Sequence, residues 1–183
     1  SAPPPAPPCG VDELKAMSLR EKLAQRLVVG VTGADDARAI VDSEQLGGIF
    51  VGTWTDLGML QNGQVKKISD AGKTPLMVTV DQEGGRVNRL ADLGVDMPSA
   101  RSLAASGVSA QEARAQAKSA GEKMREMGIT VDFAPIVDVS DQDDDTVIGD
   151  RSFSNDPKVV TEYAGAVAAG LEVLRAGKHD GVV

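Results

Sequence analysis

The sequence predicts an α/β fold with a parallel sheet. Four short apolar runs, at 27–31, 49–51, 76–80 and 133–137, alternate with segments of helical periodicity, which is the order expected of βαβ units. The runs are continuously apolar, as is typical of strands covered on both faces. An open doubly wound sheet and a (β/α)₈ barrel both fit. No Gly-x-Gly-x-x-Gly follows the first strand, so the nucleotide-binding form of the open sheet loses its main support.

The predicted helices carry recognisable start and stop signals. Ser18 and Glu21 have the spacing of a capping box, Gly128 is a favourable stop, and Pro157 suits a first helical turn. We expect helices at 11–24, 35–45, 56–71, 110–127 and 157–176. Each lies before, between or after the predicted strands, so the chain contains about four strand–helix units. A complete (β/α)₈ barrel needs about 250 residues.

Composition excludes several classes of protein. The chain has 183 residues, of which 42% are hydrophobic and 25% charged, with a net charge of -8, so disorder throughout is excluded. An acidic chain without a basic run is a poor candidate for binding nucleic acid or an anionic membrane. One Cys and one His exclude a disulfide framework and a Cys/His zinc site within the chain. No apolar stretch approaches the roughly 18 residues of a membrane span.

The first residues have the composition of a tether. Residues 1–8 read Ser-Ala-Pro-Pro-Pro-Ala-Pro-Pro, an extended polyproline-type segment that buries little surface. Such segments commonly follow a cleaved export signal or a lipid-anchored Cys. We therefore expect a tether at 1–10, a domain at 11–183, and an exported protein of the cell envelope or exterior, with a possible lipid anchor upstream of residue 1. Cys9 is compatible with a disulfide to a Cys outside this chain and equally with a free thiol.

The third predicted strand runs into a loop rich in charge and glycine. Residues 81–89 read Asp-Gln-Glu-Gly-Gly-Arg-Val-Asn-Arg, which places Asp81 at the carboxyl edge of the sheet, where parallel α/β folds bind ligands. The two glycines allow a tight turn, and Arg86 and Arg89 supply planar donors near the acid. Such a set can bind the hydroxyl groups of a sugar. A turn held by a structural Asp–Arg pair fits the spacing equally well.

The fourth strand is followed by acidic residues in the same way. It ends at Asp138, and the loop 141–145 and then Asp150 and Arg151 follow. The acidic run lacks the spaced ligands and closing Glu of an EF-hand, so we expect a solvated loop and no metal. Arg151 is placed to reach the pocket of Asp81. The alternative is that Arg151 pairs with a neighbouring loop carboxylate.

Three strings in this chain, at 80–89, 128–139 and 146–153, resemble the signature of glycoside hydrolase family 3 in its β-N-acetylhexosaminidase branch. They occur in the order and spacing of that family, and the similarity covers about residues 14–171. The Pro-rich start and the acidic loop are most similar to actinobacterial members that are exported as lipoproteins.

The resemblance implies a (β/α)₈ barrel of which this chain supplies about the first four to five βα units. It also implies a retaining, exo-acting β-N-acetylglucosaminidase. The expected activity is release of terminal N-acetylglucosamine from cell-wall muropeptide fragments or chito-oligosaccharides, without a cofactor. By the same resemblance, Asp81, Arg89 and Arg151 bind the terminal sugar.

The resemblance assigns no catalytic residue to this chain. The family's acid/base His and nucleophilic Asp belong to motifs beyond the matching region. Lys178-His179 imitates a sugar-contacting pair, but Phe-Pro-Gly does not follow it. We therefore expect the N-terminal half of an enzyme, inactive alone. The alternative is a non-catalytic sugar-binding or structural half-barrel that self-associates through its open edges.

Overall fold

A computed structural model describes residues 10–172 and contains one parallel sheet. Its strands stand in the order β1 (Val28–Val31), β2 (Gly48–Val51), β3 (Met77–Val80) and β4 (Val131–Asp132), and each neighbouring pair is parallel. The predicted parallel α/β fold is confirmed. Within the described residues β1 and β4 each have one neighbour, as four consecutive strands of a (β/α)₈ barrel would.

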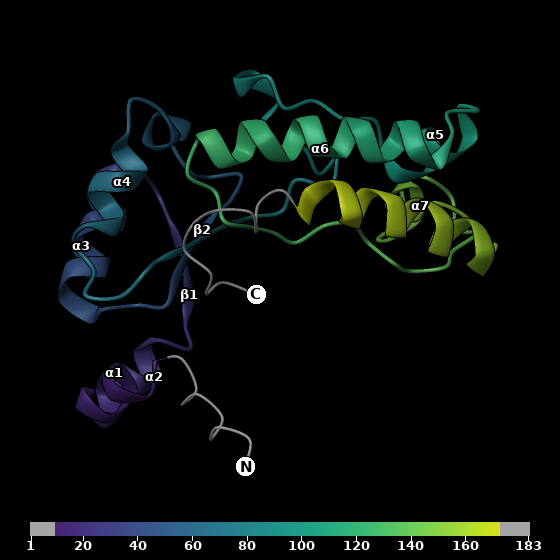
Figure 1. Ribbon diagram of the computed structural model, residues 1–183. Coiled ribbons are helices and arrows are strands. Elements are labelled where there is room, and N and C mark those ends of the chain that lie inside the picture. Colours follow the sequence, from purple (N-terminus) through teal and green to yellow (C-terminus); the bar gives the residue numbers. More distant parts are fainter. Residues whose placement is uncertain (1–9, 173–183) are drawn as a thin grey trace, which may run out of the picture.

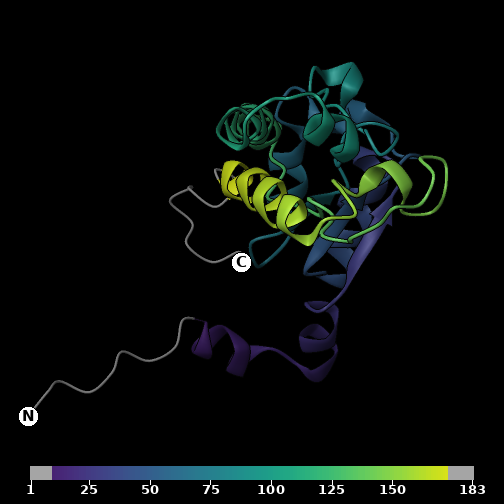
Figure 2. The same cartoon turned by 90° about the vertical axis from the view of Figure 1, so that its right-hand side faces the viewer.

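Helices precede and connect the strands (Figure 1). The α-helices are α1 (Val11–Ala16), α2 (Leu19–Ala24), α3 (Ala34–Glu44), α4 (Gln64–Ser69), α5 (Ala100–Ala105), α6 (Ala110–Glu126) and α7 (Pro157–Leu171). Three short 3₁₀ turns are η1 (Leu57–Leu60), η2 (Ala91–Leu93) and η3 (Gly149–Arg151). Figure 2 shows α1 and α2 set apart from the layer of α6 and α7. No helix within residues 10–172 combines the length and apolar character of a membrane span.

Helix caps explain where the predicted helices begin and divide. The expected helix at 11–24 is two helices because Ser18 starts a new one: its Oγ accepts from the Glu21 N–H, and Glu21 Oε2 accepts from the Ser18 N–H at 2.8 Å. The expected helix at 56–71 is interrupted because Asn62 and Gly63 adopt φ angles of 53° and 69°, outside the helical range. Gly128, at φ 89°, follows the end of α6 as predicted.

The structure corrects the predicted fourth strand and adds elements that were not predicted. A strand over 133–137 is wrong: after Asp132 the Phe133 N–H still donates to Val80 O at 2.8 Å, but Pro135 has no N–H with which to continue a ladder, and β4 ends. The elements α5, η2 and η3 were not predicted from the sequence. The predicted end of the last helix, at 176, lies outside the described residues.

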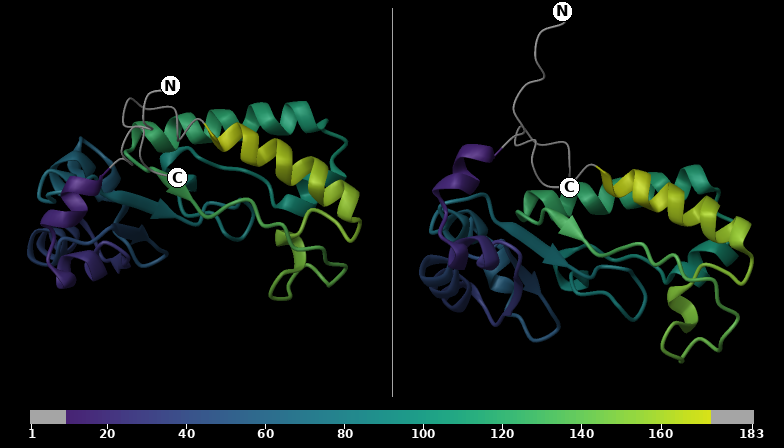
Figure 3. Two further views of the ribbon diagram at one scale, coloured as in Figure 1. Left: turned by 60° about the horizontal axis from the view of Figure 1, so that its bottom comes forward. Right: turned by 90° about the horizontal axis from the view of Figure 1, so that it is seen from below.

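The core lies between one face of the sheet and the helices. Alternate strand side chains, among them Val31, Ile49 and Val80, are fully buried in the same apolar cluster as residues of α3, α4 and α6, and Figure 3 shows helices along the sheet. The opposite face carries Val28 and Phe50, and Val28 is 39% exposed. The expectation of two covered faces therefore holds for one face within residues 10–172.

Helices α6 and α7 lie side by side (Figures 1 and 2) and approach closely at Gly170. A Cβ atom at Gly170 would stand 2.5 Å from Arg114 O and 2.7 Å from the Ala117 Cβ. Since the nearest atom belongs to backbone, it cannot move aside easily. Gly165, on the same helix, has no such neighbour within 4 Å.

These two glycines make a matched test of the helix contact. Gly170→Ala should lower the free energy of unfolding by about 1–3 kcal/mol through overpacking. Gly165→Ala should raise it by up to about 1 kcal/mol, because alanine favours the helix over glycine. Urea unfolding followed by circular dichroism measures both. Equal effects of the two substitutions would contradict the close packing of α6 and α7.

Candidate functional site

The loop after β3 continues the alternation of the strand. Asp81 and Glu83 are partly exposed, whereas Gln82 between them is only 3% exposed. Gly84 and Gly85 then adopt φ angles of 92° and 58°, which non-glycine residues rarely adopt, and the expected tight turn is confirmed. The two carboxylates therefore lie on one side of the chain and the amide of Gln82 on the other.

Asp81 and Arg89 form a two-pronged ion pair. Arg89 Nε donates to Asp81 Oδ1 at 2.9 Å, and Arg89 Nη2 donates to Asp81 Oδ2 at 2.6 Å. Both side chains are about a fifth exposed. The hydrogen bonds to Asp81 raise the pKa of Arg89 above its ordinary value, although burial opposes this. The pair thus holds one carboxylate and one guanidinium group in a defined orientation at the carboxyl edge of the sheet.

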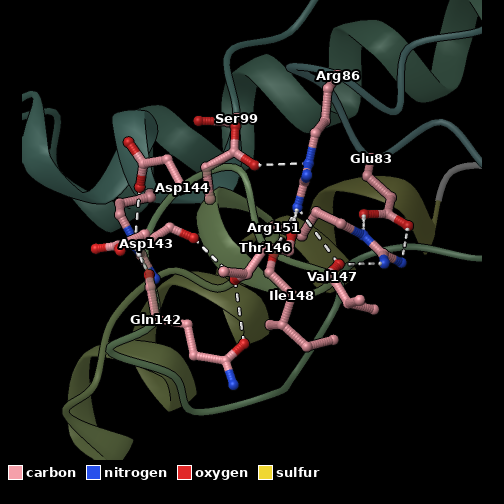
Figure 4. A network of polar contacts seen from close by, with 12 residues as sticks. Glu83, Arg86, Ser99, Gln142, Asp143, Asp144, Thr146, Val147, Ile148 and Arg151 are labelled. Atoms are coloured by element: carbon pink, nitrogen blue, oxygen red, sulfur yellow. Dashed lines mark hydrogen bonds and ion pairs between the residues drawn. The ribbon is translucent and has the colours of Figure 1, made fainter.

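Glu83 and Arg151 form a second pair of the same geometry (Figure 4). Arg151 Nε and Nη2 each donate to a different Glu83 oxygen at 2.8 Å, and Arg151 Nη1 donates to Val147 O at 3.0 Å. The hydrogen bonds from Arg151 to Glu83 raise the Arg151 pKa, and Asp81 raises it further by its charge. The two pairs are therefore close enough to interact electrostatically.

The structure thus brings Asp81, Arg89 and Arg151 to one edge of the sheet, as predicted. It also contains both of the structural pairings that the sequence left open, since each arginine is engaged by a carboxylate of the same loop. Carboxylate and guanidinium groups in this arrangement offer charge-assisted acceptors and donors to sugar hydroxyls. Binding of a sugar by these three residues stays a prediction.

Arg86 takes a different position from Arg89. Its Nε lies 2.9 Å from Asp150 Oδ1, and its Nη2 donates to Ile148 O at 3.1 Å, to Val147 O at 3.3 Å and to Thr146 O (Figure 4). The loop 81–89 and the segment 146–151 are consequently joined twice, by Arg86 in one direction and by Arg151 in the other. Arg86 supports the segment that carries Arg151.

The acidic loop 141–145 is solvent-exposed. Asp144 Oδ1 accepts from Arg101 Nη1 at 2.8 Å, and the same guanidinium donates to Gln142 O at 2.7 Å and Ser140 O at 3.0 Å. No group of three or more potential metal-ligating side chains occurs in the part of the chain that the structure describes. Asp138, which ends the apolar run, is exposed, and its carbonyl accepts from Ser152 Oγ at 2.7 Å.

A carboxyl group with a buried oxygen atom lies beside the site and was not predicted from the sequence. Asp132, the last residue of β4, accepts from the Gln82 N–H at 2.9 Å through Oδ1. Its Oδ2 is buried and makes no hydrogen bond in the structure. Burial is the main cause that raises the pKa of Asp132 to about 7; the hydrogen bond from Gln82 opposes this shift, and the charges of Asp81 and Glu83 add to it. The one available signal was a polar residue within an apolar run.

A small, partly open cavity of about 20 Å³ adjoins the second ion pair. Its walls include Glu83, Arg151, Leu103 and Phe153. A volume of this size holds about one water molecule, so the cavity is not a sugar pocket.

The raised pKa of Asp132 predicts a pH-dependent stability. Between about pH 4 and pH 7 the folded protein binds a proton that the unfolded chain releases, so this carboxyl group stabilises the protein at low pH and the contribution is lost as the pH rises through 7. Asp132→Asn keeps the acceptor for Gln82 and cannot ionise. At pH 8 the free energy of unfolding of this variant should exceed that of the wild type by a few kcal/mol, since one pKa unit corresponds to about 1.4 kcal/mol.

The measurement is urea unfolding of both proteins at pH 5 and pH 8. Asp92→Asn, at an exposed carboxylate of the neighbouring 3₁₀ turn, is the control and should leave the pH dependence unchanged. If the free energies of unfolding of Asp132→Asn and the wild type differ by the same amount at pH 5 and pH 8, burial of an uncharged carboxyl group is contradicted.

Comparison with known proteins identifies the family to which this fold belongs. Residues 18–180 match the Glycosyl hydrolase family 3 N terminal domain. The beta-hexosaminidase LpqI of Mycobacterium tuberculosis is 51% identical over 178 residues, which are 95% of this chain and 45% of that protein. The chain therefore spans about half the length of this curated relative.

Solved structures give the same result. A family 3 glycosyl hydrolase of Mycobacterium smegmatis superimposes with a TM-score of 0.85 at 56% identity, over 88% of this chain and 49% of that one. A family 3 beta-N-acetylglucosaminidase of Paenibacillus superimposes with a TM-score of 0.74 at 29% identity, over 87% of this chain and 32% of that one. The β3 and β4 edge with its two ion pairs thus stands on an N-terminal domain of known type, and the chain belongs to glycoside hydrolase family 3.

Proposed function

We propose that this chain forms the sugar-binding half of a retaining, exo-acting β-N-acetylglucosaminidase. The observation that carries the proposal is the pair of guanidinium–carboxylate contacts at the carboxyl edge of a family 3 sheet. Relatives named beta-hexosaminidase, and a structural neighbour from Paenibacillus named beta-N-acetylglucosaminidase, support the substrate class.

Each of the three residues has a role suited to its chemistry. Asp81 accepts hydrogen bonds from hydroxyl groups of the terminal sugar, while Arg89 and Arg151 donate to its oxygen atoms. Because both guanidinium groups are already held by carboxylates, they are oriented before the sugar arrives, which lowers the entropy cost of binding. The sugar is thereby held at the carboxyl end of the strands, where (β/α)₈-barrel enzymes have their active sites.

Hydrolysis itself requires a nucleophile and an acid/base group on opposite sides of the scissile bond. We place both outside residues 1–183, in the remaining part of the barrel. The natural substrates in this proposal are cell-wall muropeptide fragments or chito-oligosaccharides. The Pro-rich residues 1–8 support export to the cell envelope or exterior, with attachment through a lipid.

One observation favours the alternative of a self-associating half-barrel. Trp54 and Phe133, both next to Phe50 on the uncovered face of the sheet, are 60% and 51% exposed. Exposed aromatic side chains and open strand edges favour association with another surface. Light scattering of the 183-residue chain tests this alternative, which requires a dimer or larger species.

Substitution of Asp81 tests the sugar site in a glycosidase that contains this chain together with the remaining barrel. Asp81→Ala should lower kcat/KM for 4-nitrophenyl N-acetyl-β-glucosaminide about tenfold to a hundredfold for each charge-assisted hydrogen bond lost, at about 1.5–3 kcal/mol each. Arg151→Lys should also lower kcat/KM, because lysine keeps the charge but lacks the planar guanidinium that can make two parallel hydrogen bonds. Asp92→Ala, on the exposed turn that follows, is the control. An unchanged kcat/KM for Asp81→Ala would remove the assignment.

The 183-residue chain alone should release no measurable 4-nitrophenol from the same substrate. Loss of members of a catalytic set costs about 10⁴ to 10⁶ in kcat in a well-studied protease, and here both principal members are assigned elsewhere. The Asp81→Ala chain controls for contaminating host enzyme. Turnover that this substitution abolishes would show that residues 1–183 are catalytic by themselves.

A further inference from the structure

We infer that Gln82 is a positioning residue that sets the place of Arg89 in the sugar site. The inference rests on the proposed function, because it concerns how that same site is built. Gln82 does not face the two ion pairs: it is 3% exposed, whereas Asp81 and Glu83 on either side are partly exposed. Any influence of Gln82 on a bound sugar must therefore pass through its neighbours.

The side-chain amide of Gln82 makes four hydrogen bonds. Its Oε1 accepts from the backbone N–H groups of Arg89 and Leu90, at 2.7 and 3.0 Å. Its Nε2 donates to Asn88 Oδ1 at 2.6 Å and to Val95 O at 3.1 Å. These bonds use both lone pairs of the oxygen and both protons of the nitrogen, which is the full capacity of an amide.

The partners of the amide define which end is oxygen and which is nitrogen. Backbone N–H groups can only donate and Val95 O can only accept, so a flipped amide would lose three contacts. Asn88 is held in turn, because its Nδ2 donates to Asp96 Oδ1 at 2.6 Å. A carboxylate in place of the amide would face acceptors at two of its four contacts.

The backbone of Arg89 is the point at which this network meets the sugar site. Gln82 holds the Arg89 N–H, and the Arg89 guanidinium holds the Asp81 carboxylate at 2.9 and 2.6 Å. Gln82 is thus joined to Asp81 by peptide linkage on one side and through Arg89 on the other. The side-chain amide of Gln82 thus closes the loop, and Arg89 at its end comes back to contact Asp81, the residue before Gln82.

The opposite side of Gln82 is fixed as well. Its own N–H donates to Asp132 Oδ1 at 2.9 Å, at the end of β4. Gln82 therefore links the loop to the sheet through its backbone N–H and to the chain at Val95 through its side-chain amide. Because Gln82 makes these contacts from behind the site, its loss should disturb the position of Arg89 more than the chemistry of bond cleavage.

Gln82→Met and Gln82→Glu test the inference in a glycosidase that contains this chain with the remaining barrel. Methionine is of similar length but replaces none of the four hydrogen bonds, so KM for 4-nitrophenyl N-acetyl-β-glucosaminide should rise at least about tenfold, the equivalent of one buried hydrogen bond. Glutamate keeps the acceptors for Arg89 and Leu90, so its KM should lie between those of Gln82→Met and the wild type. In both variants kcat should fall by a smaller factor than KM rises.

Gln116→Glu, on the exposed face of α6, introduces the same charge and should leave both constants unchanged. Thermal unfolding of each variant, measured beside activity, identifies any protein that is not folded at the assay temperature. If the folded Gln82→Met variant has the KM of the wild type, the inference is overturned. If the wild type does not cleave the glycoside, the proposed function is contradicted, and the role of Gln82 in sugar binding is contradicted with it.

A double-substitution cycle separates positioning of Arg89 from general loosening of the fold. Gln82→Met is combined with Arg89→Lys, and the affinity for N-acetylglucosamine is measured by calorimetry for the wild type, both single variants and the double variant. If Gln82 acts through Arg89, its substitution should change the affinity less than about twofold once Arg89 is replaced. An equal effect of Gln82→Met in the presence and absence of Arg89 would contradict the inference.

Discussion

The geometry of the candidate site depends on the two guanidinium–carboxylate forks that meet at the loop 81–89. One fork lies within the loop, from Arg89 to Asp81, and the other joins the loop to Arg151. Two parallel hydrogen bonds define orientation as well as distance, so each carboxylate holds the plane of its guanidinium group in one orientation. Asp81 directly follows Val80, which pairs with Val51 and Asp132. The register of the sheet therefore determines where along the strand direction the two ion pairs lie.

Partly buried charges need polar support, since removing them from water is costly unless their hydrogen bonds are satisfied. Here neutral and charged groups behind the forks supply that support. Gln82 holds the first fork from within the loop, and Arg86 holds the segment that carries the second. Asp132 receives a single hydrogen bond in the same layer. Burial raises the pKa of Asp132 and the Gln82 hydrogen bond opposes this shift, whereas the pKa values of Arg89 and Arg151 are raised by their carboxylate partners.

The uncovered face of the sheet has its own physical meaning. Val28, Trp54 and Phe133 are substantially exposed within a chain that otherwise buries an ordinary core. A sheet that forms part of a closed barrel presents this face to the barrel interior. Exposure on this face therefore agrees with a family 3 N-terminal domain that spans about half the length of its curated relatives.

The sequence by itself determined the alternation of helices and parallel strands, the capping box of Ser18 and Glu21, the helix start at Pro157, and the placement of Asp81 at the end of a strand. These features depend on local patterns of apolar residues, caps and glycine, which are legible along the chain. The end of β4, the division of the expected helix at 56–71, and the helix α5 were missed, because local apolarity does not show where a ladder or helix is interrupted. The tertiary structure alone decided that Arg151 meets Glu83, that Arg86 meets Asp150, and that Oδ2 of Asp132 is buried. Those partners are separated by many residues in sequence, and only the folded register and loop packing bring their atoms within hydrogen-bonding distance.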